Sequence, residues 1–405
     1  LSLWFFSLLG LIIICSLFYL NCINVLLLND YFLIDTLGVY LSFISIIFLL
    51  FFIILIINSL NFLNIFGIFM SIVFAVICFF SLNSLIFWVS YEISILFALV
   101  LILYSSPYSE RFLASWYLLI YVFISSLPML FFIIYWSLEN ETFNLFLWNN
   151  DNNLLIMLIL GILFITKVPL PPFHSWLPVV HAEASSYVSI ILSGYIMKLG
   201  LIGLFRFCYF GFNNIGLLIL VVFSFSLLFF FASGQELDIK RWLAFLSLSH
   251  IFIGILGLFY FNFNSYWIVG LYCLGHGLSA FLLFYLFMVL NTIVGSRNWL
   301  LLTLNNNISI FYYILIVLSL LSVSSFPPTI NFFSEIFVFS SIFSSFIAII
   351  FYSFYIFIGG IVPVIVLSLF IINSKLVSLS NVYTFLDLII LLGLSFICYL
   401  GIFWI

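Results

Sequence analysis

Charge is what this sequence has least of. Only 5% of the 405 residues are Asp, Glu, Lys or Arg, whereas 67% are hydrophobic. Soluble proteins are about a quarter charged, so this composition excludes a water-soluble globular protein and indicates an integral membrane protein. The net charge of -4 and the lack of a basic cluster give no support to nucleic-acid binding.

Cysteine pairs and early basic residues are also missing. The spacing of the cysteines contains no CxxC motif, so neither an iron-sulfur cluster nor a structural zinc or other metal site is indicated. The first basic residue is Arg111, so we expect no positively charged targeting segment and a chain made in the compartment where it is inserted. The six cysteines are Cys15, Cys22, Cys78, Cys208, Cys273 and Cys398.

Long apolar runs fill most of the chain. A helix needs about 20 apolar residues to cross a bilayer, because every backbone polar group must be satisfied within the segment. Apolar residues run continuously instead of alternating, which excludes a β-barrel. The sequence therefore predicts an all-α polytopic protein, a single integral membrane domain over 1–405. Its thirteen predicted spans are 2–20, 36–58, 61–81, 83–104, 112–137, 154–172, 185–207, 214–234, 240–262, 266–290, 307–347, 351–373 and 382–404.

Two of these spans are interrupted by proline, which removes backbone donors and breaks a helix. The sixth breaks at Pro169, Pro171 and Pro172 in "KVPLPPFHSW", and the eleventh at Pro327 and Pro328 in "SSFPPTINFFSE". Paired interrupted helices at matching places in two halves are typical of inverted-repeat transporters. We therefore predict two inverted five-helix repeats, formed by helices 3 to 7 (about 61–207) and helices 8 to 12 (about 214–373).

The loop charges predict the orientation. Basic residues concentrate on one side of the predicted spans, and only Arg206 lies near the other, where we expect it to extend to the outer surface. The positive-inside rule then places the amino terminus inside and the carboxyl terminus outside. The basic residues on the inner side are Arg111, Lys240, Arg241, Arg297 and Lys375.

Six ionisable residues lie within or beside the spans, where each charge costs a few kcal/mol. They should therefore face one another and not lipid. A lysine drawn between burial and a nearby carboxylate can exchange a proton at ordinary pH. We predict a proton relay with Lys167 as its switch, opened to water by the adjacent prolines. The alternative is a static ion pair between Glu92 and Lys167. The six are Glu92, Lys167, Lys198, His250, His276 and Glu335.

Histidine suits the remaining steps of such a relay, because its ordinary pKa of about 6.5 lets it gain and lose a proton readily. His276 lies in "LGHGLSAF", where Gly275 and Gly277 would let another backbone or a water molecule approach the ring. The alternative is that His250 and His276 only bond helices together.

A second group of polar residues follows the first break. His174, His181 and Glu183 are candidates for proton uptake at the inner surface, or ordinary interfacial residues beside Trp176. Two histidines and one distant carboxylate without a fixed scaffold are weak evidence for a metal.

Several segments together resemble the antiporter-like subunits of respiratory complex I, and the subunit 4 branch in particular. They are "KVPLPPFHSWLPVVHAEASSYVSIILSGYIMKLGLIGLFR" from 167, "YEISILFALVLILYSSPYSERFLASWYLLIYVFISSLPML" from 91, "DIKRWLAFLSLSHI" from 238, "HGLSAFLLF" from 276 and "FPPTINFFSE" from 326. The resemblance implies that Glu92 modulates Lys167, that Lys198 and the central histidines connect the half-channels, and that Glu335 takes a distal site where relatives often have lysine.

The sequence also departs from that family. Ser185 replaces a usual proline, and Val179 stands where many relatives carry a lysine, so an uptake route through that loop would lack this basic residue. The family typically has fourteen helices, so one amino-terminal helix is expected to be missing here.

The resemblance further implies a function. Such a subunit moves protons from the mitochondrial matrix to the intermembrane space while other subunits oxidise NADH and reduce ubiquinone. It holds no NADH, flavin, iron-sulfur cluster or ubiquinone itself. Its partners are other membrane-arm subunits, including antiporter-like subunits 2 and 5, and lipids of the mitochondrial inner membrane, with the amino terminus in the matrix and the carboxyl terminus in the intermembrane space. The alternatives are a free-standing cation/proton antiporter and a structural subunit without its own proton path.

Overall fold

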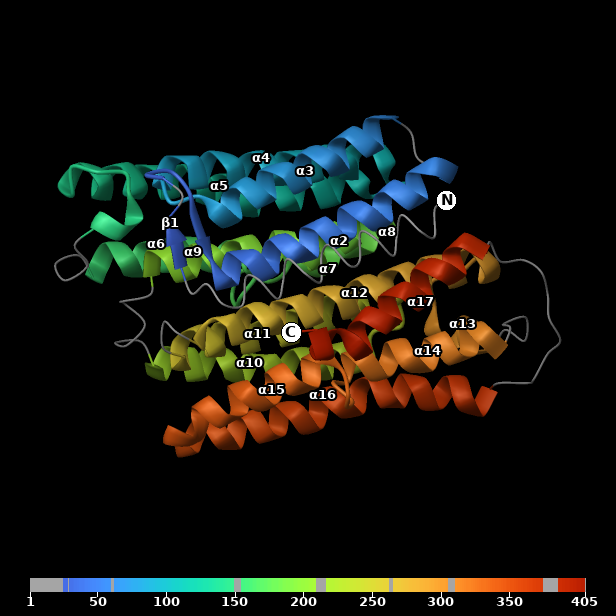
Figure 1. The fold of residues 1–405 in the computed structure, drawn as a ribbon. Coiled ribbons are helices and arrows are strands. Elements are labelled where there is room, and N and C mark those ends of the chain that lie inside the picture. Colours follow the sequence, from blue (N-terminus) through green and yellow to red (C-terminus); the bar gives the residue numbers. More distant parts are fainter. Residues whose placement is uncertain are drawn as a thin grey trace.

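The computed structural model describes residues 25–27, 29–59, 62–148, 154–208, 216–261, 265–304, 310–373 and 385–404. Within these ranges, helices lie side by side in a bundle (Figure 1). Seven of them are long and apolar enough to cross a membrane, and shorter apolar helices accompany them. The all-α membrane fold predicted from the sequence is therefore confirmed. The predicted span 2–20, Cys15, Cys22 and Lys375 lie outside the described residues.

The predicted spans from residue 36 onward each coincide with a described helix or a group of consecutive helices. The α-helices are α2 (Thr36–Ser59), α3 (Phe62–Phe80), α4 (Ser84–Ser105), α5 (Arg111–Glu139), α6 (Leu154–Lys167), α7 (Trp176–Glu183), α8 (Ser186–Ile191), α9 (Met197–Cys208), α10 (Gly216–Gln235), α11 (Ile239–Tyr260), α12 (Trp267–Val294), α13 (Trp299–Leu304), α14 (Ile310–Val323), α15 (Ile330–Ser341), α16 (Phe346–Asn373) and α17 (Phe385–Leu400). Shorter turns are η1 (Leu145–Leu147), η2 (Leu192–Ile196), η5 (Ile342–Ser344) and η6 (Gly401–Trp404).

A small β-hairpin precedes the helices and was not predicted. Strand β1 (Val25–Leu27) pairs antiparallel with β2 (Leu33–Asp35) in a two-stranded sheet. The Asn29 side chain accepts a hydrogen bond from the Phe32 backbone at 3.1 Å, as expected for a turn. A bridge between Phe32 and Ser81 ties the hairpin to the segment between α3 and α4. These strands are too short to give a period-2 pattern that sequence reasoning could detect.

The sixth predicted helix ends earlier than expected. We predicted 154–172, but α6 stops at Lys167, because Pro169 and the following prolines cannot supply backbone donors. The freed carbonyl of Thr166 accepts a hydrogen bond from Trp176 Nε1 at 3.1 Å. The second break is built alike: α14 ends before the prolines, and Asn331 donates to the Ser322 carbonyl at 3.2 Å. Both Pro-Pro peptide bonds, 171–172 and 327–328, are cis.

Two loops with the same hydrogen-bonding pattern occur at opposite ends of the bundle. An isolated bridge joins Asn83 to Asn144 before α4, and another joins Asp238 to Asn298 before α11. In the first loop, the backbone N–H groups of Ser84 and Leu145 donate to the carbonyls of Phe143 and Leu82, respectively. In the second loop, those of Ile239 and Trp299 donate in the same order to the carbonyls of Arg297 and Leu237. Figure 1 places β1 and α6 at one end and α13 at the other. This agreement supports the inverted repeat, whose boundaries stay a prediction.

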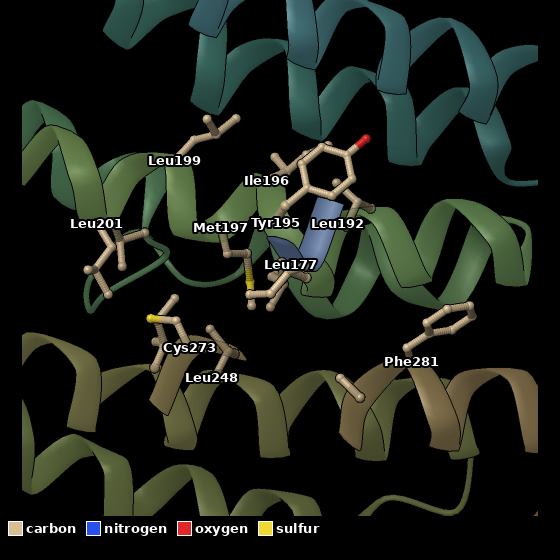
Figure 2. Close-up of a cluster of buried hydrophobic side chains, with 14 of the residues drawn as sticks. Leu177, Leu192, Tyr195, Ile196, Met197, Leu199, Leu201, Leu248, Cys273 and Phe281 are labelled. Carbon is tan, nitrogen blue, oxygen red and sulfur yellow. The ribbon is translucent and has the colours of Figure 1, made fainter. Parts of the chain in front are cut away.

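The centre of the bundle is the continuous segment α8, η2 and α9. In its membrane-spanning stretch, 100% of the residues are buried inside the protein. The corresponding share is 33% for α5 and 33% for α16, so these two helices present most of their surface outward. Figure 2 shows part of the apolar packing between this segment, which contributes Tyr195 and Met197, and the neighbouring helices, which contribute Leu248, Cys273 and Phe281. Lys198 belongs to this central segment, so its charge lies among protein groups and not lipid.

Candidate proton path

Glu92 on α4 and Lys167 on α6 form a buried ion pair. Lys167 Nζ lies 2.6 Å from Glu92 Oε1, and the two side chains are 0% and 8% exposed. The ammonium also lies 4.1 Å from the centre of the Tyr91 ring, a cation-π contact. Glu92 Oε2 is buried without a hydrogen-bond partner among the described residues. The carboxylate is therefore held on one oxygen only, which leaves it free to change partner.

Lys198 occupies the middle of the bundle, where the helix widens. The π-turn η2 lies directly before α9, and such turns are frequent at functional sites. The Lys198 ammonium donates to the Ser193 carbonyl and lies 3.1 Å from His276 Nδ1 on α12. Both side chains belong to buried residues. An ammonium and an imidazole at this distance can share one proton.

His250 on α11 lies beside His276. The two imidazole centroids are 5.6 Å apart. His250 Nδ1 lies 2.5 Å from the Tyr355 hydroxyl on α16, and the His250 backbone carbonyl accepts from the Tyr272 hydroxyl at 2.7 Å. His250 Nε2 is buried and has no hydrogen-bond partner among the described residues. This nitrogen is thus open to a water molecule or to a rotated neighbour.

The glycines beside His276 allow close backbone approach, as the sequence predicted. A Cβ placed on Gly275 would lie 2.3 Å from Asn331 Oδ1 and 3.1 Å from the Asn331 backbone nitrogen. A Cβ on Gly277 would lie 3.3 Å from the Gly194 carbonyl oxygen. The His276 ring therefore sits where α12 meets both the central segment and α15.

Glu335 on α15 lies beside the second break. Its Oε1 accepts a hydrogen bond from Ser325 Oγ at 2.7 Å. Ser325 has φ of 54°, a left-handed conformation that costs energy for any residue with a side chain. The Glu335 backbone carbonyl accepts from the Tyr352 hydroxyl at 2.9 Å, and Tyr352 stacks on Tyr355. Aromatic hydroxyls thus lie between Glu335 and His250.

The six predicted residues are all buried, and the structure brings them into three groups. Glu92 pairs with Lys167; Lys198, His276 and His250 form the central group; Glu335 stands with Ser325. Within the described residues, no hydrogen bond connects the first group to the second. Their helices nevertheless touch, because a Cβ on Gly200, two residues after Lys198, would lie 3.5 Å from the Lys167 carbonyl carbon. The relay role of these six residues stays a prediction.

The three polar residues after the first break do not converge. His181 is fully buried, stacks on Phe284 with centroids 5.2 Å apart, and has neither ring nitrogen hydrogen-bonded to a described residue. His174 is half-buried against Phe229, and Glu183 is half-buried at the end of α7. Among the described residues, no three His, Cys, Asp or Glu side chains are arranged to hold a metal ion. His181 alone of the three lies in the protein interior.

Two cations hold the carboxyl end of α7. Lys240 Nζ donates to the Ala184 carbonyl at 2.5 Å, and Arg297 Nη1 donates to the Ala182 carbonyl at 2.6 Å. Cations satisfy the free carbonyls at a helix end and the negative end of its dipole. The Arg297 guanidinium also lies over the Tyr108 ring at 4.1 Å. Burial raises the pKa of Tyr108 above its ordinary value, and the Arg297 charge opposes that shift.

Arg206 departs from its expected place. The sequence predicted a side chain extending to the outer surface, but this side chain is only 5% exposed and lies 3.5 Å from the Asp35 carboxylate. The reason is that α9 runs through the interior and Phe79 offers its carbonyl to Arg206 Nη2 at 2.5 Å. The guanidinium is thus bound inside the protein.

The sequence reasoning missed three tyrosines, Tyr272, Tyr352 and Tyr355, whose hydroxyls line the region between His250 and Glu335. A hydroxyl inside a membrane helix needs a hydrogen-bond partner. That requirement could have singled them out. They were hidden because 22 tyrosines and 56 phenylalanines are scattered through the chain.

Comparisons with known proteins agree on one family. A family model described as NADH:quinone oxidoreductase/Mrp antiporter, TM, matches residues 81–361, more than half of the chain. NADH-ubiquinone oxidoreductase chain 4 of Rhipicephalus sanguineus is 32% identical over 280 residues, covering 64% of this chain and 61% of that protein. The chain 4 protein of Artemia franciscana is 32% identical over 270 residues, covering 65% of this chain and 68% of that protein. The matched region thus spans about two thirds of the length of these relatives, and slightly less for the first.

Solved structures show the same fold. A chain of respiratory complex I from Thermus thermophilus with bound NADH is similar with a TM-score of 0.79 and 18% identity, covering 92% of this chain and 83% of that one. A chain of the Mrp complex from Dietzia sp. DQ12-45-1b has a TM-score of 0.71 at 15% identity, covering 86% of this chain and 68% of that one. With the family match over residues 81–361, the protein belongs to the NADH:quinone oxidoreductase/Mrp antiporter membrane family.

Proposed function

We propose that this chain is a proton-translocating antiporter-like subunit of respiratory complex I in the mitochondrial inner membrane. The observation that carries the proposal is the buried contact between Lys198 and His276, 3.1 Å apart, which connects α9 of the first predicted repeat to α12 of the second. The chain 4 relatives, named NADH-ubiquinone oxidoreductase, support the assignment. Protons move from the matrix to the intermembrane space while other subunits oxidise NADH and reduce ubiquinone.

The Glu92–Lys167 pair acts as the switch in this proposal. With the pair closed, the carboxylate and the Tyr91 ring stabilise the charged ammonium. When Glu92 turns away, Lys167 loses that stabilisation in a buried site, so it releases its proton. Each proton moved against about 150 mV requires roughly 3.5 kcal/mol. Breaking one buried ion pair changes the local free energy by about that amount.

Proton uptake belongs to the end of the bundle that carries α13. A cavity there is lined by Ser186, Lys240, Phe284, Asn291 and Arg297 together with apolar side chains. Phe284 stacks directly on the buried His181, so this histidine lies next to the cavity. Glu183 and the half-buried His174 lie on the same short stretch. We assign His181, not His174, as the inner proton acceptor.

Redox cofactors belong to other subunits in this proposal. The chain contributes proton transfer, and NADH, flavin, iron-sulfur clusters and ubiquinone are bound elsewhere in the complex. Its neighbours include antiporter-like subunits 2 and 5 and membrane lipids. The basic residues Arg111, Lys240, Arg241 and Arg297 mark the matrix side. The amino terminus then faces the matrix and the carboxyl terminus the intermembrane space.

Replacement of Lys167 by alanine tests the function. We expect Lys167→Ala to leave assembly of the complex intact and to abolish coupled proton pumping, measured as protons released per NADH oxidised in closed membrane vesicles. Gly234→Ala is a matched control, because a Cβ at that position meets no atom within 4 Å. Normal assembly together with undiminished pumping in Lys167→Ala would instead identify a structural subunit.

A free-standing cation/proton antiporter is the second candidate. It is favoured by the similarity to the Mrp complex, with its TM-score of 0.71. Co-purification after mild detergent extraction separates the two. Complex I subunits should be present in the first case. In the second case, the chain should instead show cation-dependent proton exchange in liposomes without them.

A further inference from the structure

Arg206 and Asp35 form a second buried ion pair, which the relay described above does not use. Their side chains are 5% and 10% exposed, and Arg206 Nη2 lies 3.5 Å from Asp35 Oδ2. The same nitrogen donates to the Phe79 carbonyl at 2.5 Å. Arg206 Nε and Nη1 are buried and have no partner among the described residues. A buried guanidinium with unsatisfied donors calls for a ligand that accepts hydrogen bonds.

The carboxylate of this pair is fixed by the start of α2. Asp35 Oδ1 accepts from the Gly38 backbone nitrogen at 3.0 Å. A Cβ at Gly38 would lie 2.4 Å from Asp35 Oδ1 and 2.9 Å from the Phe79 carbonyl oxygen. Any side chain at position 38 would therefore displace two of the groups that hold Arg206. Glycine at position 38 therefore leaves room for the Asp35 carboxylate and the Phe79 carbonyl beside Arg206.

Cys78 precedes Phe79, the residue whose carbonyl binds Arg206. Its residue is fully buried on α3, next to Phe79. The thiol lies 3.8 Å from the Phe87 carbonyl. Ser90 also donates to the Phe87 carbonyl at 3.1 Å. Cys78 and Ser90 thus share the Phe87 carbonyl.

The pair lies at the end of the bundle opposite the proposed uptake cavity. Asp35 is the last residue of β2, and Arg206 lies near the end of α9. Figure 1 places β1 and α9 at one end and α13, next to Arg297, at the other. A proton that enters beside Arg297 and leaves beside Arg206 would cross the whole bundle.

We propose that Arg206 and Asp35 form a water-binding outer gate, through which protons leaving the relay reach the outer face. This inference rests on the proposed function and adds the exit to it. The ligand is water: Arg206 Nε and Nη1 donate to water oxygens, and no covalent bond changes. Arginine stays protonated in proteins, so it positions the water and does not carry the proton. Asp35 offsets the guanidinium charge, which would otherwise repel a hydrated proton.

Gly38→Ala tests the gate while keeping every charged group. We expect assembled complex with a large loss of protons released per NADH, because the methyl group displaces Asp35 and the Phe79 carbonyl. Gly360→Ala is the matched control, since a Cβ there meets no atom within 4 Å and should leave pumping unchanged. Unchanged pumping in both variants would overturn the proposal.

Arg206→Ala with chemical rescue separates a gate from a merely structural pair. We expect this variant to lose pumping, and millimolar guanidinium added to the outer face of closed vesicles to restore part of it. Arg206→Lys keeps the charge but not the forked donors, and should pump less than the parent protein. If Arg206→Ala does not assemble, the Gly38→Ala comparison decides. Assembled Arg206→Ala that pumps normally, or that loses pumping without rescue, would contradict the gate.

Lys167→Ala, measured alongside, tells the two proposals apart. If it retains pumping, the proposed function itself fails. If it loses pumping while Gly38→Ala and Arg206→Ala keep theirs, the function stands and only the outer gate is wrong.

Discussion

Lys198 Nζ lies 3.1 Å from Nδ1 of His276, and this contact joins two helices of the predicted repeats in the interior of the bundle. The Ser193 carbonyl holds the same ammonium. If the lysine is charged, Nδ1 must accept, so the remaining imidazole proton lies on Nε2. If the lysine is neutral, the imidazole can donate instead. The pair therefore has two hydrogen-bonded states that differ by the position of one proton.

His276→Gln tests whether that proton moves. A glutamine can still accept a hydrogen bond from Lys198, so assembly should persist, but it cannot take up a proton in this range. We expect proton transfer to slow by about 100-fold or more, the low end of what a positioned acid-base group contributes. Single-turnover pumping in vesicles measures this, with Gly234→Ala as the control. A glutamine variant that pumps at the parent rate would leave His276 only a structural role.

The Glu92–Lys167 pair gives a prediction on stability. Removing one partner leaves an uncompensated buried charge, which typically costs about 3–5 kcal/mol, whereas replacing both with apolar residues is often neutral. We expect Glu92→Leu alone to lower the thermal stability of the complex, and Glu92→Leu with Lys167→Met to restore it. The double variant should still fail to pump. Pumping by the stable double variant would mean that the ion pair only holds helices.

Much of the fold could be predicted from the sequence. The spans follow from apolar runs, and the positions of the breaks follow from proline chemistry, because these depend on local residues alone. The six buried ionisable residues were also identifiable, since charge is so costly in a membrane that each occurrence indicates a purpose. Lys167 and Glu92 were correctly expected to meet.

The remainder depended on contacts between distant segments. Arg206 was misplaced because its burial requires the Asp35 carboxylate, 171 positions away along the chain, and the Phe79 carbonyl. The separation of His174 from His181 arises from the short helix α7, which the apolar pattern does not show. Tyr355 was missed because its partner is on another helix. Sequence patterns report the environment of a residue better than its partner.

Gly275→Ala probes the packing of the His276 region. A methyl group at this position would lie 2.3 Å from Asn331 Oδ1 and 3.0 Å from Ile330 Cγ2, so α15 would have to shift. Overpacking of this kind typically costs about 1–3 kcal/mol. We expect reduced amounts of assembled complex on native gels and a lower inactivation temperature. The comparison with Gly360→Ala, which has open space, isolates the steric effect; equal assembly of the two would show that α15 adapts freely.

Ser325 gives a prediction in which two effects oppose each other. Its φ of 54° is unfavourable for a residue with a Cβ, and its hydroxyl donates to Glu335 at 2.7 Å. Ser325→Ala keeps the strained backbone and loses the hydrogen bond to the carboxyl group, a loss of about 1.5–3 kcal/mol if that group is charged. Ser325→Gly loses the same bond but removes a strain of about 1–2 kcal/mol.

Alanine should therefore be more destabilising than glycine at this position, as measured by the inactivation temperature of the assembled complex. Pumping should respond differently, because both variants remove the only described hydrogen-bond donor to Glu335 Oε1. We expect both to impair proton transfer at this site equally, despite their unequal stability. If pumping instead follows stability across the two variants, Ser325 supports the helix break and not the proton path. That outcome would confine the role of Glu335 to packing beside α16.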